Sequence, residues 1–143
     1  MYLNFINMSH IEGRNIRQMT DSELLLFEGH SGALPIYEKL KKEILDVYPD
    51  VRIKVQKTQI SFSRKYLFAC VSFTKVRKAK DRPKNWLVVT FGLGHQEESP
   101  RIDVATEPYP NRWTHHVLIS ETDEIDDELM AWIREAGEFA ERK

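Results

Sequence analysis

The sequence concentrates cationic side chains in one short stretch, KVRKAKDRPKNW (residues 75–86), which holds six Lys or Arg residues and one Asp. Ammonium and guanidinium groups bind phosphate and carboxylate oxygens, and successive cations can contact successive phosphates of a nucleic acid. Trp86, together with exposed Phe or Tyr side chains, would then stack on bases. This stretch predicts an anionic ligand or a nucleic acid as the partner.

A second polar group follows from the alternation of residues 52–63. If Ile60 and Phe62 point to a core, Gln59 and Ser61 point to the opposite face, and Lys57 lies in the turn just before them. Amide, hydroxyl and ammonium donors on one surface suit the oxygens of a phosphate or carboxylate. The alternative is a solvated sheet face that binds nothing.

The stretch NRWTHHVLIS holds two histidines. Strand alternation puts His115 on the apolar face, where we expect a core histidine with satisfied hydrogen bonds, and puts His116 on the other face with Arg112. His116 can bind an anion or carry a proton near neutral pH. An enzyme alternative makes His116 the general base and Arg112 an oxyanion clamp in a small hydrolase. Consecutive strand histidines point opposite ways and lack a spaced Cys or carboxylate partner, so we predict no metal site here.

The formal net charge of -1 hides a strong segregation of charge. Residues 52–94 hold 11 basic and 1 acidic residue, whereas residues 95–143 hold 5 basic and 13 acidic residues. The two segments would neutralise each other if they fold together, and a homodimer in which the basic stretch meets a partner's acidic last helix is a further alternative. The pI of about 6.5 lies below the values above roughly 9 that are typical of dedicated nucleic-acid domains.

The single cysteine and the absence of long apolar runs bear on location. Cys70 lies in an apolar stretch, cannot form an intramolecular disulfide and is expected to be a small buried side chain. The sequence has no run of about 18 apolar residues and no signal-peptide pattern. We therefore expect a cytoplasmic protein without a membrane segment.

Hydrophobic periodicity predicts helices, then strands, then a helix. Thr20 and Glu23 have the spacing of a capping box before a short helix, and a longer helix follows over residues 33–48. Residues 51–120 alternate with the period of strands, and residues 125–140 return to helical spacing with Thr122 or Asp123 as the cap. This order predicts an α+β, two-layer domain with two N-terminal helices and one C-terminal helix on one face of a mainly antiparallel sheet of about five to six strands. We expect residues 1–18 to be a loosely attached extension and residues 19–143 to form a single domain.

Four segments resemble a known family: LPIYEKLKKEIL, KTQISFSRKYLFACVSF, EPYPNRWTHHVLIS and IDDELMAWIREAGEFA. Together they resemble the small bacterial domain of unknown function numbered five-six-five-five, some of whose members are labelled predicted transport proteins. The resemblance covers residues 21–140. In that family the last helix typically ends in an Ala-Tyr pair, whereas here Gly137 follows Ala136. The resemblance implies a compact α+β domain without an established activity, so it transfers no catalytic residue.

These observations predict a non-enzymatic binding module that needs no metal or cofactor and binds an anionic ligand or nucleic acid through a basic sheet face and loop. No residue is predicted to be catalytic or to bind a metal. The predicted ligand-binding residues are Lys57, Gln59, Ser61, Arg64, Arg112 and His116, with Lys78 and Arg82 as outer electrostatic contacts.

Overall fold

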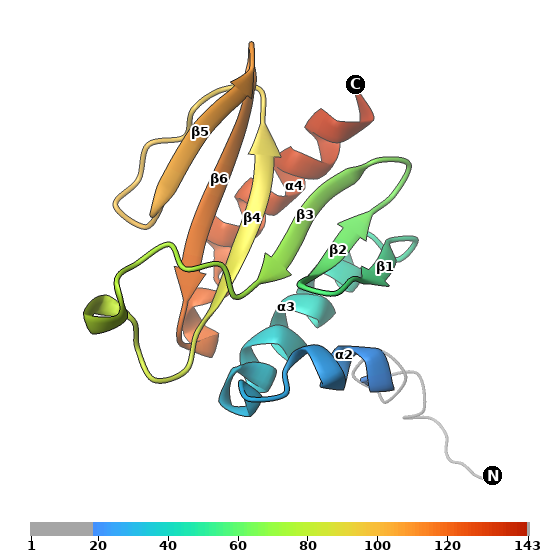
Figure 1. Cartoon of the computed structure of the whole chain (residues 1–143). Coiled ribbons are helices and arrows are strands. Elements are labelled where there is room, and N and C mark those ends of the chain that lie inside the picture. The colour runs from blue at the N-terminus through green and yellow to red at the C-terminus, as the bar shows by residue number, and fades with distance from the viewer. Residues whose placement is uncertain (1–18, 143) are drawn as a thin grey trace, which may run out of the picture.

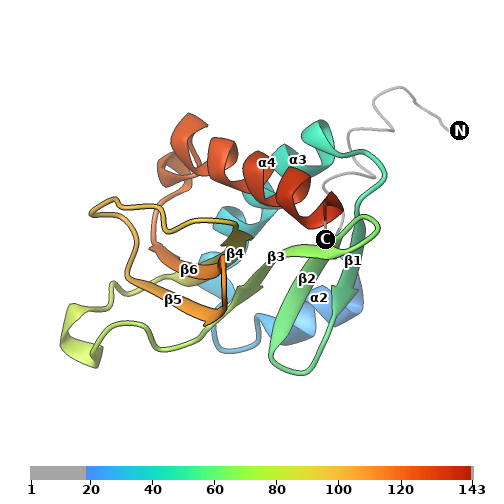
Figure 2. The same cartoon turned by 90° about the horizontal axis from the view of Figure 1, so that it is seen from above.

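The computed structural model describes residues 19–142, so the predicted extension over residues 1–18 lies outside the described part. A six-stranded antiparallel sheet forms one layer, and α3 and α4 cover one of its faces, as Figures 1 and 2 show. This arrangement confirms the predicted α+β class and antiparallel sheet. None of the helices in residues 19–142 has the length and apolar character that a membrane span requires.

The helices are α2 (Asp21–Leu26), α3 (Leu34–Val47) and α4 (Asp127–Glu141), with short 3-10 turns η1 (Ser31–Ala33), η2 (Ala79–Asp81) and η3 (Thr122–Glu124). The strands are β1 (Arg52–Val55), β2 (Gln59–Ser63), β3 (Leu67–Ser72), β4 (Leu87–Leu93), β5 (Val104–Tyr109) and β6 (Arg112–Ile119). They lie in the order β1-β2-β3-β4-β6-β5, so β1 and β5 are the two edges of the sheet.

The capping box predicted for α2 is present. The Thr20 hydroxyl accepts a hydrogen bond from the Glu23 N–H at 3.1 Å, and the Glu23 carboxylate accepts one from the Thr20 N–H at 2.8 Å. The same carboxylate, buried, also binds Lys41 Nζ at 2.9 Å and accepts a hydrogen bond from the Tyr37 hydroxyl. Because Lys41 and Tyr37 belong to α3, one carboxylate both caps α2 and joins it to α3.

The last helix begins later than the sequence indicated. Thr122 and Asp123 form part of η3, and the cap of α4 is Asp126, whose carboxylate accepts a hydrogen bond from the Leu129 N–H at 3.0 Å. The two predicted caps were therefore wrong. Thr122 and Asp123 both have side chains that can cap a helix. They lie in η3, however, which ends before α4 begins, so Asp126 caps the first N–H groups of α4.

The core lies between the sheet and the two long helices. Tyr37, Leu40 and Ile44 of α3 and Leu129 and Ile133 of α4 are fully buried against the inward-pointing strand residues. A second, smaller cluster lies on the opposite face of the sheet, beneath the chain that joins β3 to β4; it consists of Trp86, Val88 and Leu118, with Phe73 and Val76 packed on it.

The two central strands β3 and β4 pair over only part of their length. Their register runs from Ala69↔Phe91 to Ser72↔Val88, while Leu67 pairs with β2. Beyond Ala69 the two strands separate, and α4 passes behind the opening (Figure 1). This divergence has a direct consequence for the surface of the molecule, because it opens a cleft through the sheet.

Candidate functional site

Four polar side chains from four adjacent strands lie in one row across the sheet face that carries no long helix. The register pairs Ser61 with Cys70, Cys70 with Thr90, and Thr90 with His116. A hydrogen bond of 2.8 Å joins Thr90 Oγ1 to His116 Nδ1. We call Ser61, Cys70, Thr90 and His116 the polar row.

Gln59 extends the polar row toward β1. Its side-chain N–H donates hydrogen bonds to Ser61 Oγ and Gln56 Oε1, both at 3.1 Å, and the Ser61 hydroxyl donates to Gln56 Oε1 at 2.7 Å. The predicted residues Gln59 and Ser61 therefore lie together on the outer face with their donors partly engaged. Ligand oxygens would compete with Gln56 for these donors.

The polar row is electrically neutral near pH 7. Burial raises the pKa of the Cys70 thiol, although its hydrogen bond with Thr90 opposes this, and burial lowers the pKa of His116. Both shifts favour the uncharged form because a charged group loses hydration when it is buried. A reactive cysteine requires the opposite shift toward the thiolate, so this arrangement favours hydrogen bonding over nucleophilic catalysis.

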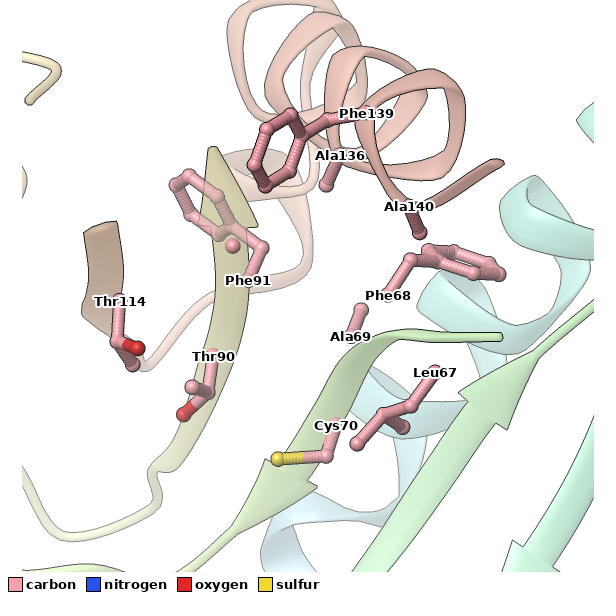
Figure 3. Close-up of a pocket in the computed structure, with 11 residues that line it drawn as sticks. Leu67, Phe68, Ala69, Cys70, Thr90, Phe91, Thr114, Ala136, Phe139 and Ala140 are labelled. Carbon is pink, nitrogen blue, oxygen red and sulfur yellow. The ribbon is translucent and has the colours of Figure 1, made fainter. Parts of the chain in front are cut away.

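A cleft of about 220 Å³ opens where β3 and β4 diverge (Figure 3). Its strand wall includes the Cys70 thiol and the Thr90 and Thr114 hydroxyls, and Phe139 comes from α4 behind the sheet (Figure 3). The cleft therefore shares Cys70 and Thr90 with the polar row, which places apolar space beside hydrogen-bonding groups. The lining residues are Leu67, Phe68, Ala69, Cys70, Thr90, Phe91, Gly92, Thr114, Ala136, Phe139 and Ala140.

The basic stretch belongs to the β3–β4 loop (residues 73–86), which is anchored at two points. Arg77 Nε binds Asp103 Oδ1 at 2.7 Å, and the Arg82 guanidinium lies 5.5 Å from the centre of the Trp86 ring. Trp86 itself is only 8% exposed, so the expectation that it stacks on bases was wrong. Its ring is packed over Val88 and Leu118, where it fixes the loop.

Most cations of this loop have no ion-pair partner in the described part of the chain. Within residues 19–142, no hydrogen bond or ion pair is formed by the side chains of Lys75, Lys78, Lys80 and Lys84. These ammonium groups are therefore exposed to solvent and to any anion that approaches the loop.

The acidic last helix does not neutralise the loop. Its N-terminal carboxylates bind Arg101, which lies 2.9 Å from Asp126 and 3.0 Å from Glu128. The helix also lies on the other side of the sheet from the loop (Figure 2). Among the ion pairs of the described residues, Arg77–Asp103 alone joins the basic segment 52–94 to the acidic segment that follows it.

The predicted site residues divide between the two ends of the sheet. Gln59, Ser72, Val88 and Leu118 are cross-strand neighbours, so the start of β2 and the β3–β4 loop lie at the same end. Lys57 in the β1–β2 turn, Lys78 and Arg82 belong to this end. Two residues belong to the opposite end: Arg64, just after β2, and Arg112, which pairs with Tyr109. Ser61 and His116 lie between the two ends.

The two arginines at the far end differ in their contacts. Arg64 binds Asp50 at 3.3 Å and covers the Tyr48 ring at 4.5 Å, so it is engaged within the protein. Arg112 is exposed and four residues from His116 on the same strand, which corresponds to about 13 Å between their Cα atoms. A base and an oxyanion donor must both reach within about 3 Å of the reacting atoms, and this separation does not favour that arrangement.

The face assignments of β6 agree with the alternation of the sequence. His115 is fully buried, stacks on Phe91 with 5.1 Å between ring centres, and accepts a hydrogen bond at its Nε2 from the Glu97 N–H at 2.9 Å. Its Nδ1 has no hydrogen-bond partner among the residues that the structure describes. His115 is therefore a core histidine as predicted, but only one of its two ring nitrogens has a hydrogen-bond partner among the described residues.

Sequence reasoning missed Cys70 and Thr90 as members of the site. We expected Cys70 to be buried, but it is half-buried on the outer face of the sheet. The signal was present in the alternation: Ala69 and Val71 point inward, so Cys70 must point outward. Thr90 occupies the equivalent outward position between the inward-facing Val89 and Phe91.

Comparison with known proteins identifies one family. A family model described as "Domain of unknown function (DUF5655)" matches residues 26–140, which is most of the chain. Searches of curated proteins and of solved structures found no significant match. The match spans every strand and both long helices, from the end of α2 to the last turn of α4. The chain belongs to the family of the domain of unknown function DUF5655.

Proposed function

We propose that the chain is a non-enzymatic, cytoplasmic binding module whose outer sheet face and β3–β4 loop bind an anionic ligand, with a nucleic-acid strand as the polymeric form of that ligand. The observation that carries the proposal is a set of loop cations, Lys75, Lys78, Lys80 and Lys84, that form no ion pair within residues 19–142. Each can approach a phosphate without first breaking an ion pair with this part of the chain.

The polar row supports the same proposal. Thr90 and His116 are neutral hydrogen-bonding groups on the outer face, and Gln59 and Ser61 continue them toward Lys57 in the neighbouring turn. Neutral donors can hold ligand oxygens while cations at the rim raise the local concentration of the anion. The cations at the rim thus attract the anion, and the polar row orients it.

Binding of labelled oligonucleotides, single-stranded and double-stranded, across a series of salt concentrations tests the proposal. We expect the logarithm of the affinity to fall linearly with the logarithm of salt concentration, because each neutralised phosphate releases counterions. The double variant Lys78→Ala/Lys80→Ala should reduce the slope for single strands by about 1.4, since each contact contributes about 0.7. Fluorescence anisotropy gives both the affinity and the slope.

The control is Lys42→Ala on α3. Lys42 is an exposed cation that pairs with Asp46 at 3.0 Å in the helical layer, so its removal takes away one positive charge, half the change in the double variant, without touching the outer face. We expect an unchanged slope for this variant. Negligible binding of every oligonucleotide at low salt, or an equal loss in the control, would overturn the nucleic-acid form of the proposal.

A further inference from the structure

Three side chains of metal-binding type lie together away from the polar row, where the loop after β4 passes α4. The ligand atoms of His95, Glu97 and Glu135 all lie within 4.8 Å of one another. His95 Nε2 and Glu135 Oε2 are the closest pair, joined by a hydrogen bond of 2.6 Å. Residues 95 and 97 come from the loop and residue 135 from the middle of α4, so the fold, and not the local sequence, assembles the group.

The chain around this group is built for a close approach of loop and helix. Gly94 has no side chain, and a Cβ at this position would lie 2.9 Å from Phe139 Cε1 of α4. The glycine therefore lets the loop pass directly over the helix. One residue later, His95 faces Glu135, which lies one turn before Phe139.

Hydrogen bonds also fix the two loop residues. The His95 Nδ1–H donates to the Gln96 carbonyl oxygen at 3.3 Å, which leaves Nε2 directed at Glu135. The Glu97 N–H donates to Nε2 of the buried His115 at 2.9 Å. Metal-binding histidines usually donate their second ring N–H to a carbonyl or carboxylate in this way, and the supporting contacts orient the ligands before the ion arrives.

We propose that His95, Glu97 and Glu135 bind a divalent transition-metal ion, of the class of Zn²⁺ or Mn²⁺. One imidazole nitrogen and two carboxylate oxygens suit these ions, whereas Ca²⁺ and Mg²⁺ prefer oxygen ligands alone. The two carboxylates balance the charge of the ion. Three protein ligands leave at least one coordination position for water or for a group from a bound molecule.

The ion would replace the contact between His95 and Glu135. Their side chains are 52% and 42% exposed, and ion pairs at such exposed positions add little to stability. The pair therefore offers little resistance to an ion that coordinates both groups. Because the site lies beside α4 and not on the outer face, this proposal stands independently of the proposed function.

Isothermal titration of the tag-free full-length protein with ZnCl₂, MnCl₂ and MgCl₂ tests the site. We expect one Zn²⁺ or Mn²⁺ ion per chain and weaker binding of Mg²⁺. The variants His95→Ala and Glu135→Gln should each lower the Zn²⁺ affinity by at least about tenfold, the scale of loss seen even when only a supporting contact is removed. Glu98→Gln, which removes an exposed carboxylate next to the site, should bind as the wild type does.

Cobalt(II) gives a second readout that does not depend on affinity. Saturated wild-type protein should show a visible absorption band of protein-bound Co²⁺, and His95→Ala should change it because the nitrogen ligand is lost. Thermal unfolding of each variant without metal checks that the fold is kept. The proposal is overturned if no saturable binding occurs, if His95→Ala binds Zn²⁺ as tightly as the wild type, or if Mg²⁺ binds as well as Zn²⁺.

Discussion

His116 shows how burial decides the chemistry of a single side chain. Its Nδ1 is held by Thr90 at 2.8 Å, and burial lowers its pKa, so the ring is neutral where an exposed histidine would be partly charged. A neutral ring can form a hydrogen bond with a ligand, but it neutralises no phosphate and therefore releases no counterions. His116 and the loop lysines should therefore affect binding in different ways.

We predict that His116→Ala weakens oligonucleotide binding by about two- to thirteenfold, the effect of one lost hydrogen bond of roughly 0.5–1.5 kcal/mol, without changing the salt slope. Lys78→Ala should lower the slope. Anisotropy titrations at several salt concentrations separate the two effects. A change of slope in His116→Ala as large as that in Lys78→Ala would show that the ring binds as a cation.

Glu23 is the second residue whose surroundings define a measurement. Burial raises the pKa of its carboxyl, but hydrogen bonds from the Thr20 N–H, Tyr37 and Lys41, together with the Lys41 charge, outweigh burial and lower the pKa. A carboxyl with a lowered folded pKa stabilises the fold fully above its unfolded pKa. That stabilisation is lost as the pH falls through the folded value.

We predict that Glu23→Gln lowers the free energy of unfolding by about 3–5 kcal/mol at pH 7, because it breaks the buried ion pair between Glu23 and Lys41. The difference from the wild type should shrink as the pH falls below the usual glutamate pKa of 4.5 and through the lowered pKa of Glu23, because the carboxyl then becomes protonated in the wild type too. Urea unfolding at pH 7 and pH 3 measures both values. The control is Glu38→Gln, an exposed α3 carboxylate; the same pH response in this variant would contradict the assignment.

At the scale of elements, Gly137 determines how closely α4 approaches the end of α3. A Cβ at this position would lie 2.6 Å from Tyr48 Oη and 2.7 Å from Tyr48 Cε2. The tyrosine is held in place, since its hydroxyl donates to the Arg134 carbonyl at 3.1 Å and its ring packs on Phe68 at 5.5 Å. Tyr48 therefore occupies the space that a side chain at position 137 would need.

We predict that Gly137→Ala destabilises the protein although alanine favours helices by about 1 kcal/mol. Overpacking costs about 1–3 kcal/mol, and both the hydroxyl and the ring of Tyr48 would have to move, so we expect a net loss of about 1 kcal/mol. Chemical denaturation measures it. In a Tyr48→Ala background the same substitution should be neutral or stabilising, and a loss of equal size there would refute the steric explanation.

Element type and strand faces could be predicted from the sequence, but the site could not be assembled from it. Alternation with period two assigns Ser61 and His116 to the outer face whatever the neighbouring strands are. It does not reveal that β6 pairs with β4 although β5 lies between them in the sequence, and this pairing is what puts Thr90 beside His116. The strand between Lys57 and Arg64 does indicate that these two residues lie at opposite ends of β2, although both were assigned to one site.

For the whole molecule, the charge segregation could be predicted from the sequence, but the placement of the charged segments in space could not. The sequence was equally compatible with two arrangements, because the basic and acidic segments could either pair with each other or lie apart. The fold keeps them apart. Arg101 binds the acidic start of α4 on one side of the sheet, while the β3–β4 loop extends on the other (Figure 2). Which charged groups pair depends on contacts between residues far apart in the sequence, and a local sequence pattern does not predict these contacts.

We predict that a chain starting at Met19 unfolds in one cooperative transition, as expected for a single domain over residues 19–143. The larger of the two buried clusters joins α2, α3 and α4 to all of the strands except β5. Circular dichroism during heating, compared with the full-length chain, measures the transition. Two separate transitions, or failure of the shortened chain to fold, would contradict the single-domain assignment.

The strand order also limits how copies of the molecule can associate. A growing sheet needs a long, unobstructed edge, yet β1 offers four residues, including Arg52 and Lys54, and β5 contains Pro108 and an irregular register between Thr106 and Tyr109. Neither border is a good template for another chain. Both edge strands therefore disfavour the growth of fibres by strand addition, and a dimer would have to form through contacts between side chains.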